Sequence, residues 1–336
     1  MDSSIAIVGI DVGKKKLDVA LLVNGKIKSK VIDNSAAGHQ VLLEWLDKTK
    51  LPKAALRVCM EATGVYFEEV ATTLYDAGLA VSVVNPGCIK GFGQSENLRN
   101  KTDKADAALI ARYCAAMAPA TWAPAPLEQR QLRAWSQRIL ALKDMRQQER
   151  NRLESYEASG MGEVAEHARL LIAWFDTEIK QLEDDVDDHI DRHPGLKHDA
   201  QLITSIPGIG NTTAARILGQ LGDIRRFGNA KALAAFLGVT PRQRSSGTSL
   251  RGRTTISRKG STSMRAALYM PGMVASRHNP LLHQFAQRLA NNGMAKKAVI
   301  GAVMHKLVHL IYGVIRTGKP FDANYLSKGL AIQDGI

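Results

Sequence analysis

The sequence predicts an α/β N-terminal domain, a long helical hairpin and a mainly α-helical, basic C-terminal domain. Three observations lead to this prediction. Strands near the N-terminus pass into alternating helices and strands, a long charged stretch is nearly free of glycine and proline, and the end of the chain is strongly basic. The expected boundaries are residues 1–120, 121–195 and 196–336. With 336 residues, the chain is long enough for two or three separate hydrophobic cores.

The N-terminal domain is predicted to begin with three consecutive antiparallel strands. The stretch "IAIVGIDVGKKKLDVALLVNGKIKSKVI" has an apolar run, a glycine turn, an alternating run and an Asn-Gly pair that favours a tight hairpin. Predicted helices at Gln40–Lys48 and Val65–Ala77 then alternate with predicted strands at Ala55–Met60 and Val81–Val84. This pattern predicts a mixed sheet with helices on its faces.

The middle and the end of the chain are predicted to be helical. Glu128–Glu157 and Glu163–His189 are charged and Leu-spaced, which indicates a coiled-coil-like antiparallel hairpin or two ordinary bundle helices. The later stretch "LITSIPGIGNTTAARILGQL" has the form of a helix-hairpin-helix, in which Gly208 and Gly210 would let the backbone approach a nucleic-acid phosphate. A plain helical turn shares this pattern. Further helices are predicted at Ser263–Ser276, Pro280–Asn291 and Ala295–Arg316.

Positive charge is concentrated in the C-terminal part of the chain. The formal net charge is +13, and residues 201–336 hold 19 Lys and Arg but only three acidic residues. Residues 1–200 hold 26 basic and 29 acidic residues. Such a basic segment predicts a polyanion partner, most commonly nucleic acid, with a membrane surface as the competing interpretation. We find no apolar run of about 18 residues and no signal segment, so we expect no membrane span and a cytoplasmic protein with reduced core cysteines.

The densest positive charge surrounds two adjacent serines, Ser245 and Ser246. The segment Thr240–Gly260 carries six Lys or Arg residues and no acidic residue. It could be a solvated loop, a phosphate clamp or a loop with a reactive serine. Its cations are candidate contacts to nucleic acid because guanidinium and ammonium groups bind phosphate. They are Arg242, Arg244, Arg251, Arg253, Arg258 and Lys259.

Four carboxylates of the N-terminal domain lie where metal-dependent chemistry could use them. Asp11 follows the first strand and Glu61 the fourth, while Asp103 and Asp106 share one face at the start of a later helix. Asp18 lies further along the second strand and is left out of the set. Carboxylates so placed can hold one or two Mg²⁺ ions for phosphodiester chemistry. Each acid also has a plain structural explanation, as a turn former, a surface residue or a partner of the helix dipole.

Several sequence motifs follow one another from about residue 5 to residue 325. They include "VGIDVGKKKLDVAL", "CMEATGVYFEEVATTLYDAG", "SENLRNKTDKADAALIA", "LITSIPGIG", "LAAFLGVTPRQRSSGTSLRGR", "ISRKGSTSMRAALYMPGMVA" and "GKPFDANY". In these motifs the chain resembles DEDD-type insertion-sequence transposases of the bridge-RNA-guided "one-ten" family, to which the Piv DNA invertase is related. The first motif alone also resembles the phosphate hairpin of actin-like kinases, but their second phosphate hairpin and adenosine motif are not found.

The resemblance implies an RNase H/RuvC-like N-terminal domain in which Asp11, Glu61, Asp103 and Asp106 bind Mg²⁺. It implies that Ser246 is the nucleophile and forms a serine–DNA covalent intermediate while an insertion sequence is excised and inserted. Because the serine segment contains no base, activation would come from the carboxylates and their Mg²⁺. The implied partners are donor and target DNA, a structured noncoding bridge RNA, and further copies of the chain. The helical hairpin would join protomers into dimers that pair into tetramers with a composite active site.

Two other classes of function stay open at this point. A RuvC-type structure-selective, metal-dependent nuclease would need the carboxylates but would use no covalent step and no Ser246. A non-catalytic nucleic-acid-binding protein would leave the four placed acids unexplained. A Ser246→Ala variant that still cleaves DNA would favour the nuclease, and an Asp11→Asn variant with full function would favour the binding protein.

Overall fold

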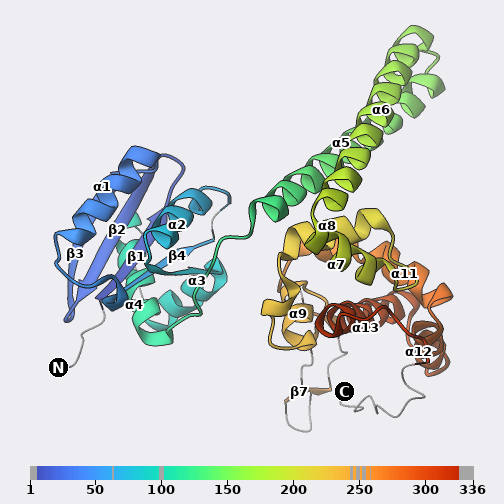
Figure 1. Ribbon diagram of the computed structural model, residues 1–336. Helices are drawn as coiled ribbons and strands as arrows, with labels where there is room; N and C mark the ends of the chain where they lie inside the picture. The colour runs from blue at the N-terminus through green and yellow to red at the C-terminus, as the bar shows by residue number, and fades with distance from the viewer. Residues whose placement is uncertain are drawn as a thin grey trace. The chain divides into compact units, whose positions relative to one another are not determined.

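The computed structural model describes most of the chain, and it forms two compact units, residues 1–124 and 125–336 (Figure 1). Of residues 245, 246, 250 and 251 only the backbone is described. The described residues are 6–62, 64–97, 102–242, 245–246, 250–251, 255–257 and 259–324.

The first unit is built on a five-stranded mixed sheet with strand order β3-β2-β1-β4-β5. β1, β2 and β3 form an antiparallel meander, and β4 and β5 run parallel to β1 and β4 respectively. The predicted α/β domain with a mixed sheet is therefore confirmed. Asn24 and Gly25 both have positive φ, 48° and 76°, which suits the tight hairpin turn. The strands are β1 (Ala6–Val12), β2 (Lys16–Val23), β3 (Lys26–Asp33), β4 (Leu56–Glu61) and β5 (Ala80–Val84).

Helices cover both faces of this sheet. Val8 and Ile10 of β1 belong to a hydrophobic cluster with α1 and α2, while Ile7, on the opposite face of the same strand, packs with α3 and α4. Apolar residues point to both faces because the central strands are covered on both sides. The helices of this unit are α1 (Ala36–Asp47), α2 (Phe67–Asp76), α3 (Pro86–Ser95) and α4 (Asp103–Met117), with a short 3₁₀ turn, η1 (Lys53–Ala55), before β4.

Helix α4 lies unusually close to β1 because β1 has a glycine at the contact. A Cβ atom on Gly9 would lie 2.2 Å from the carbonyl oxygen of Ala107 and 2.4 Å from the amide nitrogen of Ala111. Any other residue would force the helix away from the sheet. Gly9 therefore sets the distance between the end of β1 and the helix that begins with Asp103.

Helix α3 is not among the predicted elements, since the Asn-Pro-Gly sequence at its start is also typical of a turn. The structure shows these residues opening a helix. The side chain of Asn85 accepts a hydrogen bond from the amide of Gly87 at 2.7 Å, and Pro86 occupies the first helical position, where its missing N–H is not needed. Cys88 lies on this helix and is exposed, so the expectation of a core thiol is wrong for this cysteine, whereas Cys59 and Cys114 are buried and free.

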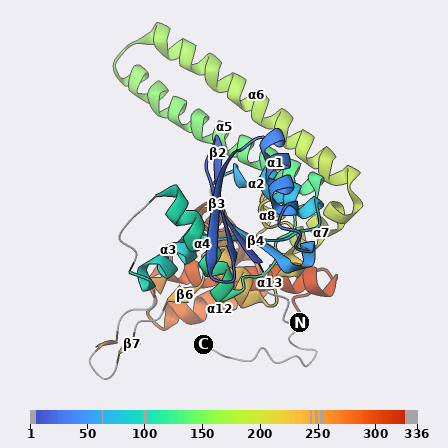
Figure 2. The same ribbon diagram turned by 90° about the vertical axis from the view of Figure 1, so that its left-hand side faces the viewer.

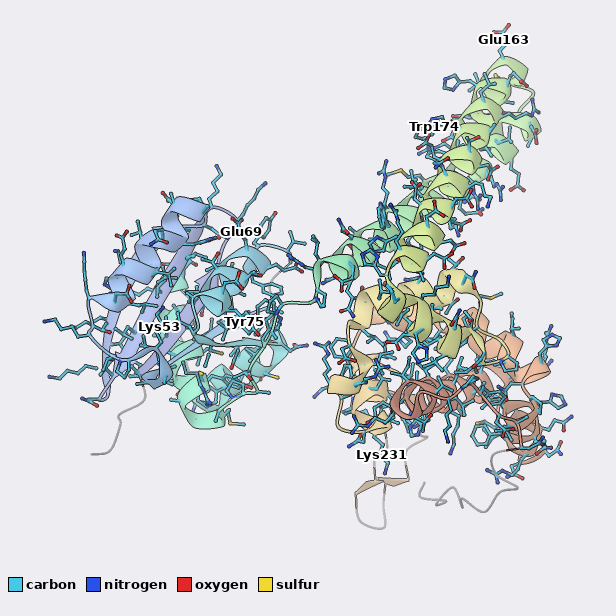
Figure 3. The ribbon with its side chains drawn as sticks, in the orientation of Figure 1. Lys53, Glu69, Tyr75, Glu163, Trp174 and Lys231 are labelled. Carbon is cyan, nitrogen blue, oxygen red and sulfur yellow. The ribbon has the colours of Figure 1, made fainter. Side chains whose placement is uncertain are left out.

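The second unit begins with two long helices, α5 (Leu127–Ala158) and α6 (Gly162–Arg192). They run side by side as a hairpin (Figure 2), and Glu163 marks its tip (Figure 3). Ion pairs link them, among them Lys143 with Glu183 at 2.6 Å. The two predicted long helices are confirmed, while coiled-coil packing between them stays a prediction.

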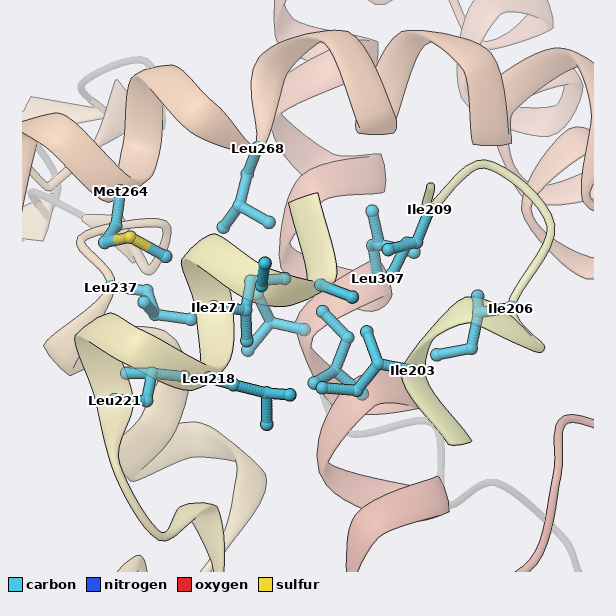
Figure 4. Close-up of a cluster of buried hydrophobic side chains, with 14 of the residues drawn as sticks. Ile203, Ile206, Ile209, Ile217, Leu218, Leu221, Leu237, Met264, Leu268 and Leu307 are labelled. Atoms are coloured by element: carbon cyan, nitrogen blue, oxygen red, sulfur yellow. The ribbon is translucent and has the colours of Figure 1, made fainter. Parts of the chain in front are cut away.

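The base of this hairpin shares one hydrophobic core with the rest of the second unit. Figure 4 shows Ile203, Ile217 and Leu307 in this core. Leu132 of α5 and Ile190 of α6 belong to the same buried cluster. The remaining helices are α7 (Pro194–Thr204), α8 (Asn211–Leu221), η2 (Ile224–Arg226), α9 (Ala230–Phe236), α10 (Thr262–Ala267), α11 (Tyr269–His278), α12 (Pro280–Asn291) and α13 (Lys296–Thr317).

The single helix predicted at Ser263–Ser276 is wrong, because the structure has two. Helix α10 ends at Ala267, and α11 starts at Tyr269. Pro271 explains the break, since proline lacks an N–H and is tolerated only in the first turn of a helix. The predicted α12 and α13 are confirmed within one residue at each end.

Among the described residues, α13 alone is long and apolar enough to cross a membrane by length and composition. Val303, Leu307 and Ile311 of this helix are completely buried at the centre of the second unit. Its apolar sequence therefore has a packing explanation as a core helix.

Candidate active site

Asp11 and Glu61 lie next to each other at the ends of two neighbouring parallel strands. The β1–β4 ladder pairs Ile10 with Met60, and each acid is the next residue of its strand. Cys59 packs on the face of the sheet that α4 covers, and Gly9 is its partner in the β1–β4 ladder. Glu61 and Asp11 lie two residues further along these strands and therefore point to the same face. The sheet thus brings these two predicted site residues together on the α4 side.

Asp18 lies beside Asp11, although it is not in the set of acids predicted from the sequence. In the antiparallel β1–β2 ladder, Asp18 is the direct partner of Asp11. It is only 7% exposed. The signal was present in the sequence, because a short turn that pairs Val12 with Leu17 also pairs the two aspartates beside them.

The first turn of α4 supplies the other two predicted acids. The Thr102 side chain caps the helix by accepting a hydrogen bond from the amide of Ala105 at 3.2 Å. Asp103 and Asp106 follow in the first turn, where the helix dipole favours negative charge. Asp103 is exposed, and Asp106 is half-buried.

The electrostatics of Asp11 show that these carboxylates interact. Burial raises the pKa of Asp11 to about 6, and the negative charges of Asp106, Asp103 and Asp18 add to the rise. Lys16 opposes the rise, but its single positive charge does not cancel it. The ammonium group of Lys16 lies 2.7 Å from Asp103 Oδ2 and 3.1 Å from Asp18 Oδ2. The site therefore carries an excess of negative charge that a cation would relieve.

The donor set suits a hard divalent cation, because it consists of carboxylate oxygens without thiolate or imidazole ligands. In the described part of the chain, no group of three or more Asp, Glu, His or Cys side chains is gathered closely enough to hold an ion as arranged. Asp106, Asp103 and Asp18 are near enough to Asp11 to raise its pKa, and the Lys16 ammonium lies between Asp103 and Asp18. The residues fit a divalent cation in chemistry and charge, provided that their side chains close around it.

The predicted serine segment belongs to the second unit. Ser245 and Ser246 form the two-residue strand β7 (Ser245–Ser246), paired antiparallel with β8 (Leu250–Arg251). Nearby, β6 (Pro241–Arg242) pairs with β9 (Thr255–Ile256). Arg242 and Lys259 are exposed, as contacts to nucleic acid require. The predicted contacts that lie outside the described residues are Arg244, Arg253 and Arg258.

The root of this segment is held against α13. The side chain of Ile256 packs where Gly301 leaves room, since a Cβ on Gly301 would lie 2.7 Å from Ile256 Cδ1. The amide of Ser257 donates to the carbonyl of Thr240 at 2.8 Å. The base of the segment is thus fixed by packing on α13 and by a backbone hydrogen bond that joins its two sides.

The two glycines between α7 and α8 differ in their surroundings. Gly208 has φ 107°, and a Cβ there would lie 2.7 Å from the Cβ of Ala275, so close packing on α11 explains this glycine. Gly210 has open space where a Cβ would sit and precedes α8, whose first residue is Asn211. Of the two, Gly210 is the exposed one, and both its contact with phosphate and the helix-hairpin-helix assignment stay predictions.

Comparison with known proteins places the chain among transposases. A profile of DEDD-type transposases of the IS110 kind matches residues 8–156, and one described as "Transposase IS116/IS110/IS902 family" matches residues 200–287. The pilin gene-inverting protein of Moraxella bovis is 33% identical over 316 residues, 94% of this chain and 97% of that protein. The pilin gene-inverting protein of Moraxella lacunata is 33% identical with the same coverage.

A more distant relative and one solved structure also match. The transposase for insertion sequence element IS1111A of Coxiella burnetii is 39% identical over 82 residues, 24% of this chain and 22% of that protein. T. thermophilus RuvC, solved in complex with a Holliday junction substrate, is 18% identical with a TM-score of 0.28, and the match covers 35% of this chain and 98% of that one. The two profiles and the relatives that match along nearly their whole length show that this chain belongs to the IS116/IS110/IS902 family of transposases, enzymes that cleave DNA and transfer its strands.

Proposed function

We propose that the chain excises and inserts an insertion sequence through a covalent serine–DNA intermediate formed by Ser246, assisted by Mg²⁺ at an RNase H/RuvC-like carboxylate site. The observation that supports this most is the convergence of acids at the ends of β1 and β4, where burial and neighbouring carboxylates raise the pKa of Asp11 to about 6. A cluster of this kind in a strand-transferring enzyme is a strong candidate for the reaction centre. The residues that would hold Mg²⁺ are Asp11, Glu61, Asp103 and Asp106.

The chemistry is divided between the two units. Ser246 Oγ would attack a DNA phosphorus, the bond from phosphorus to the leaving sugar oxygen would break, and a phosphoserine and a free hydroxyl end would result. Reversal by another hydroxyl end would rejoin the strands, and no ATP is needed because the ester is retained. When bound, Mg²⁺ would act as a Lewis acid on the reacting oxygens. Arg242 and the other cations of the segment would hold the phosphate and offset its growing negative charge.

A groove lined by Thr102 and Lys104, the two neighbours of Asp103, would receive a DNA strand. It has a volume of about 450 Å³ and runs between the edge strand β3 and the first turns of α4. Its apolar and small residues suit sugars and bases, and its one lysine suits a phosphate. The lining residues are Ile27, Ser29, Thr102, Lys104, Ala105 and Ala108.

The proposed partners follow from the family and from the charge of the chain. Donor and target DNA are the substrates, and a structured noncoding bridge RNA encoded by the element pairs with both and sets the target. The net positive charge of residues 201–336 supports binding to both nucleic acids. The helical hairpin, residues 121–195, joins protomers, and dimers pair into tetramers so that the serine of one protomer meets the carboxylates of another. The pilin gene-inverting relatives are named for a DNA inversion, which supports recombination rather than simple cleavage.

A strand-cleavage assay tests this proposal. The purified protein is incubated with Mg²⁺, labelled donor DNA and the element's flanking RNA, and products are separated on a denaturing gel. We expect cleavage by the native protein, none by Asp11→Asn or Ser246→Ala, and full cleavage by Asp47→Asn, an exposed acid at the end of α1. Cleavage by Ser246→Ala would establish the RuvC-type nuclease instead, and cleavage by Asp11→Asn would overturn the carboxylate site.

A further inference from the structure

Lys16 places a positive charge beside the carboxylates of the first unit. Its ammonium nitrogen lies 2.7 Å from Asp103 Oδ2 at the start of α4 and 3.1 Å from Asp18 Oδ2 on its own strand, β2. It therefore links two elements that are 87 residues apart in the sequence. Two neighbouring lysines, Lys14 and Lys15, are exposed, and their side chains have no ion pair within the described ranges.

Asp18 explains why Lys16 is held in this position. Its side chain is only 10% exposed, and it faces Asp11 across the β1–β2 ladder. A carboxylate so buried beside another carboxylate requires a positive partner, because desolvation and repulsion both oppose its charge. Hydrogen bonds to Asp103 and then to Asp18 raise the pKa of Lys16, so the ammonium form is firmly kept.

We propose that Lys16 is a positioning residue that acts as a built-in counter-ion: it ties the first turn of α4 to β2 and competes with the divalent cation for Asp103. The inference rests on the proposed function, because it takes Asp103 as a ligand of that cation. An ammonium group and a divalent cation repel each other and cannot share the same carboxylate oxygen at contact distance. Because Lys16 bonds only Oδ2 of Asp103, the cation must either bind Oδ1 against the repulsion of the nearby ammonium or displace Lys16, and both weaken binding of the ion.

This competition has a consequence for the order of binding. Mg²⁺ in phosphoryl-transfer sites is usually held by one or two carboxylates together with oxygens of the substrate phosphate. If Lys16 weakens binding of the ion to the protein alone, the phosphate oxygens of DNA are needed to make up the difference. Lys16 would thus favour loading of the ion together with DNA over loading of the free enzyme.

Calorimetric titration of the metal-free full-length protein with Mg²⁺ tests the competition. We expect Lys16→Met to bind Mg²⁺ about 3- to 10-fold more tightly than the native protein in the absence of DNA. Lys16→Arg, which keeps the charge, should stay close to the native affinity, and so should Lys14→Met, the matched control. With donor DNA and RNA present, the advantage of Lys16→Met should shrink. Equal or weaker binding by Lys16→Met in the absence of DNA would overturn the proposal.

Thermal unfolding in EDTA tests the positioning role without any metal or activity. We expect Lys16→Met to lower the melting temperature of the first unit by about 2 to 5 °C, because Asp18 is left without its partner. Adding Asp18→Asn to Lys16→Met should recover most of this loss, since the unpaired charge is then removed. An unchanged melting temperature for Lys16→Met, or no recovery in the double variant, would contradict the link between β2 and α4.

Failure of this inference is distinguishable from failure of the metal site itself. If Asp11→Asn abolishes Mg²⁺ binding while Lys16→Met leaves it unchanged, the carboxylate site stands and the role of Lys16 is wrong. If the native protein with its DNA and RNA binds no more Mg²⁺ than the DNA and RNA bind alone, both are wrong.

Discussion

Asp11 and Asp18 face each other across the antiparallel strands β1 and β2, on the face of the sheet that α4 covers. With Glu61 on the next strand, they place three carboxylates on three neighbouring strands. The first turn of α4 adds Asp103 and Asp106 to the same region. The first unit thus concentrates negative charge at one end of its sheet, and Lys16 supplies a positive charge within hydrogen-bond distance of two of these acids.

The stability of the metal-free protein should fall as the pH rises from about 4 to above 6. The pKa of Asp11 is 3.8 in a free side chain and about 6 in the folded protein. Between these values the folded state holds a proton that the unfolded state has lost, so raising the pH favours unfolding. Two pKa units correspond to about 3 kcal/mol, and solvent screening reduces the effect to about 1 to 2 kcal/mol. Urea unfolding in EDTA at both ends of this range measures it.

The Asp11→Asn variant lacks the carboxyl group whose titration is expected to make stability depend on pH. The loss of stability between pH 4 and 7 should be about 1 to 2 kcal/mol smaller in Asp11→Asn than in the native protein. Asp47→Asn is the control and should behave as the native protein does. Identical pH profiles for the native protein and Asp11→Asn would show that Asp11 titrates normally.

Gly9→Ala should displace α4, and with it two of the site's carboxylates, from β1. Its new Cβ would meet the backbone of Ala107 and Ala111 at less than a normal contact distance, so α4 must move away from β1. We expect a loss of about 2 to 4 kcal/mol in the free energy of unfolding, and loss of cleavage, because Asp103 and Asp106 move with the helix. Chemical unfolding and the cleavage assay measure the two effects.

Gly91→Ala is the matched control for that substitution. Gly91 lies inside α3, where a Cβ would meet nothing within 4 Å. Alanine there should stabilise the protein by about 0.5 to 1 kcal/mol, because glycine is the poorer helix former. If Gly9→Ala is as harmless as Gly91→Ala, the close approach of α4 to β1 is not what sets the site.

Thr102→Ala should loosen the turn that carries two of the acids. The Thr102 hydroxyl caps α4, and its loss should lower the free energy of unfolding by about 1 kcal/mol. Fraying of the first turn should also weaken Mg²⁺ binding, as measured by calorimetry. Thr102→Ser keeps the hydroxyl and should restore both properties, and failure of this rescue would assign Thr102 some other role.

Substitutions at the two glycines before α8 should affect different properties, folding stability at Gly208 and nucleic-acid binding at Gly210. Gly208→Ala should destabilise the second unit by about 2 kcal/mol or more, because of its positive φ and its contact with Ala275. Gly210→Ala should fold within about 1 kcal/mol of the native protein but bind nucleic acid several-fold more weakly, since its side chain stands where a phosphate is proposed to approach. Fluorescence anisotropy at fixed salt measures the binding. Unchanged binding by Gly210→Ala would remove this turn from the nucleic-acid surface.

Much of the fold could be predicted because local signals agree with the tertiary structure. The Asn24-Gly25 turn fixes the β2–β3 hairpin, and the spacing of leucines predicts α5 and α6. Helix α3 was missed because the Asn-Pro-Gly sequence at its start also fits a turn, and only packing decides between them. The break at Leu268 was missed although Pro271 indicates it, since a proline is tolerated only in the first turn of a helix.

The candidate site could be predicted in part for a similar reason. The order of strands and acids was enough to select Asp11 and Glu61, since both stand at strand ends. Asp18 was missed although the short turn after β1 sets the register that pairs it with Asp11, whereas the contact of Lys16 with Asp103 depends on where α4 packs. The proposed role of Ser246 depends on the family resemblance, since a basic loop with two serines has the same composition whether it binds phosphate or reacts with it.

The most direct test of the account is a search for the covalent protein–DNA adduct. The protein is incubated with Mg²⁺, RNA and DNA labelled on the strand that is cut, the reaction is stopped by denaturation, and the modified peptide is identified by mass spectrometry. The account predicts a phosphodiester link on Ser246, present in Ser245→Ala and absent in Ser246→Ala and Asp11→Asn. Cleavage without any adduct, or an adduct that persists in Ser246→Ala, would contradict it.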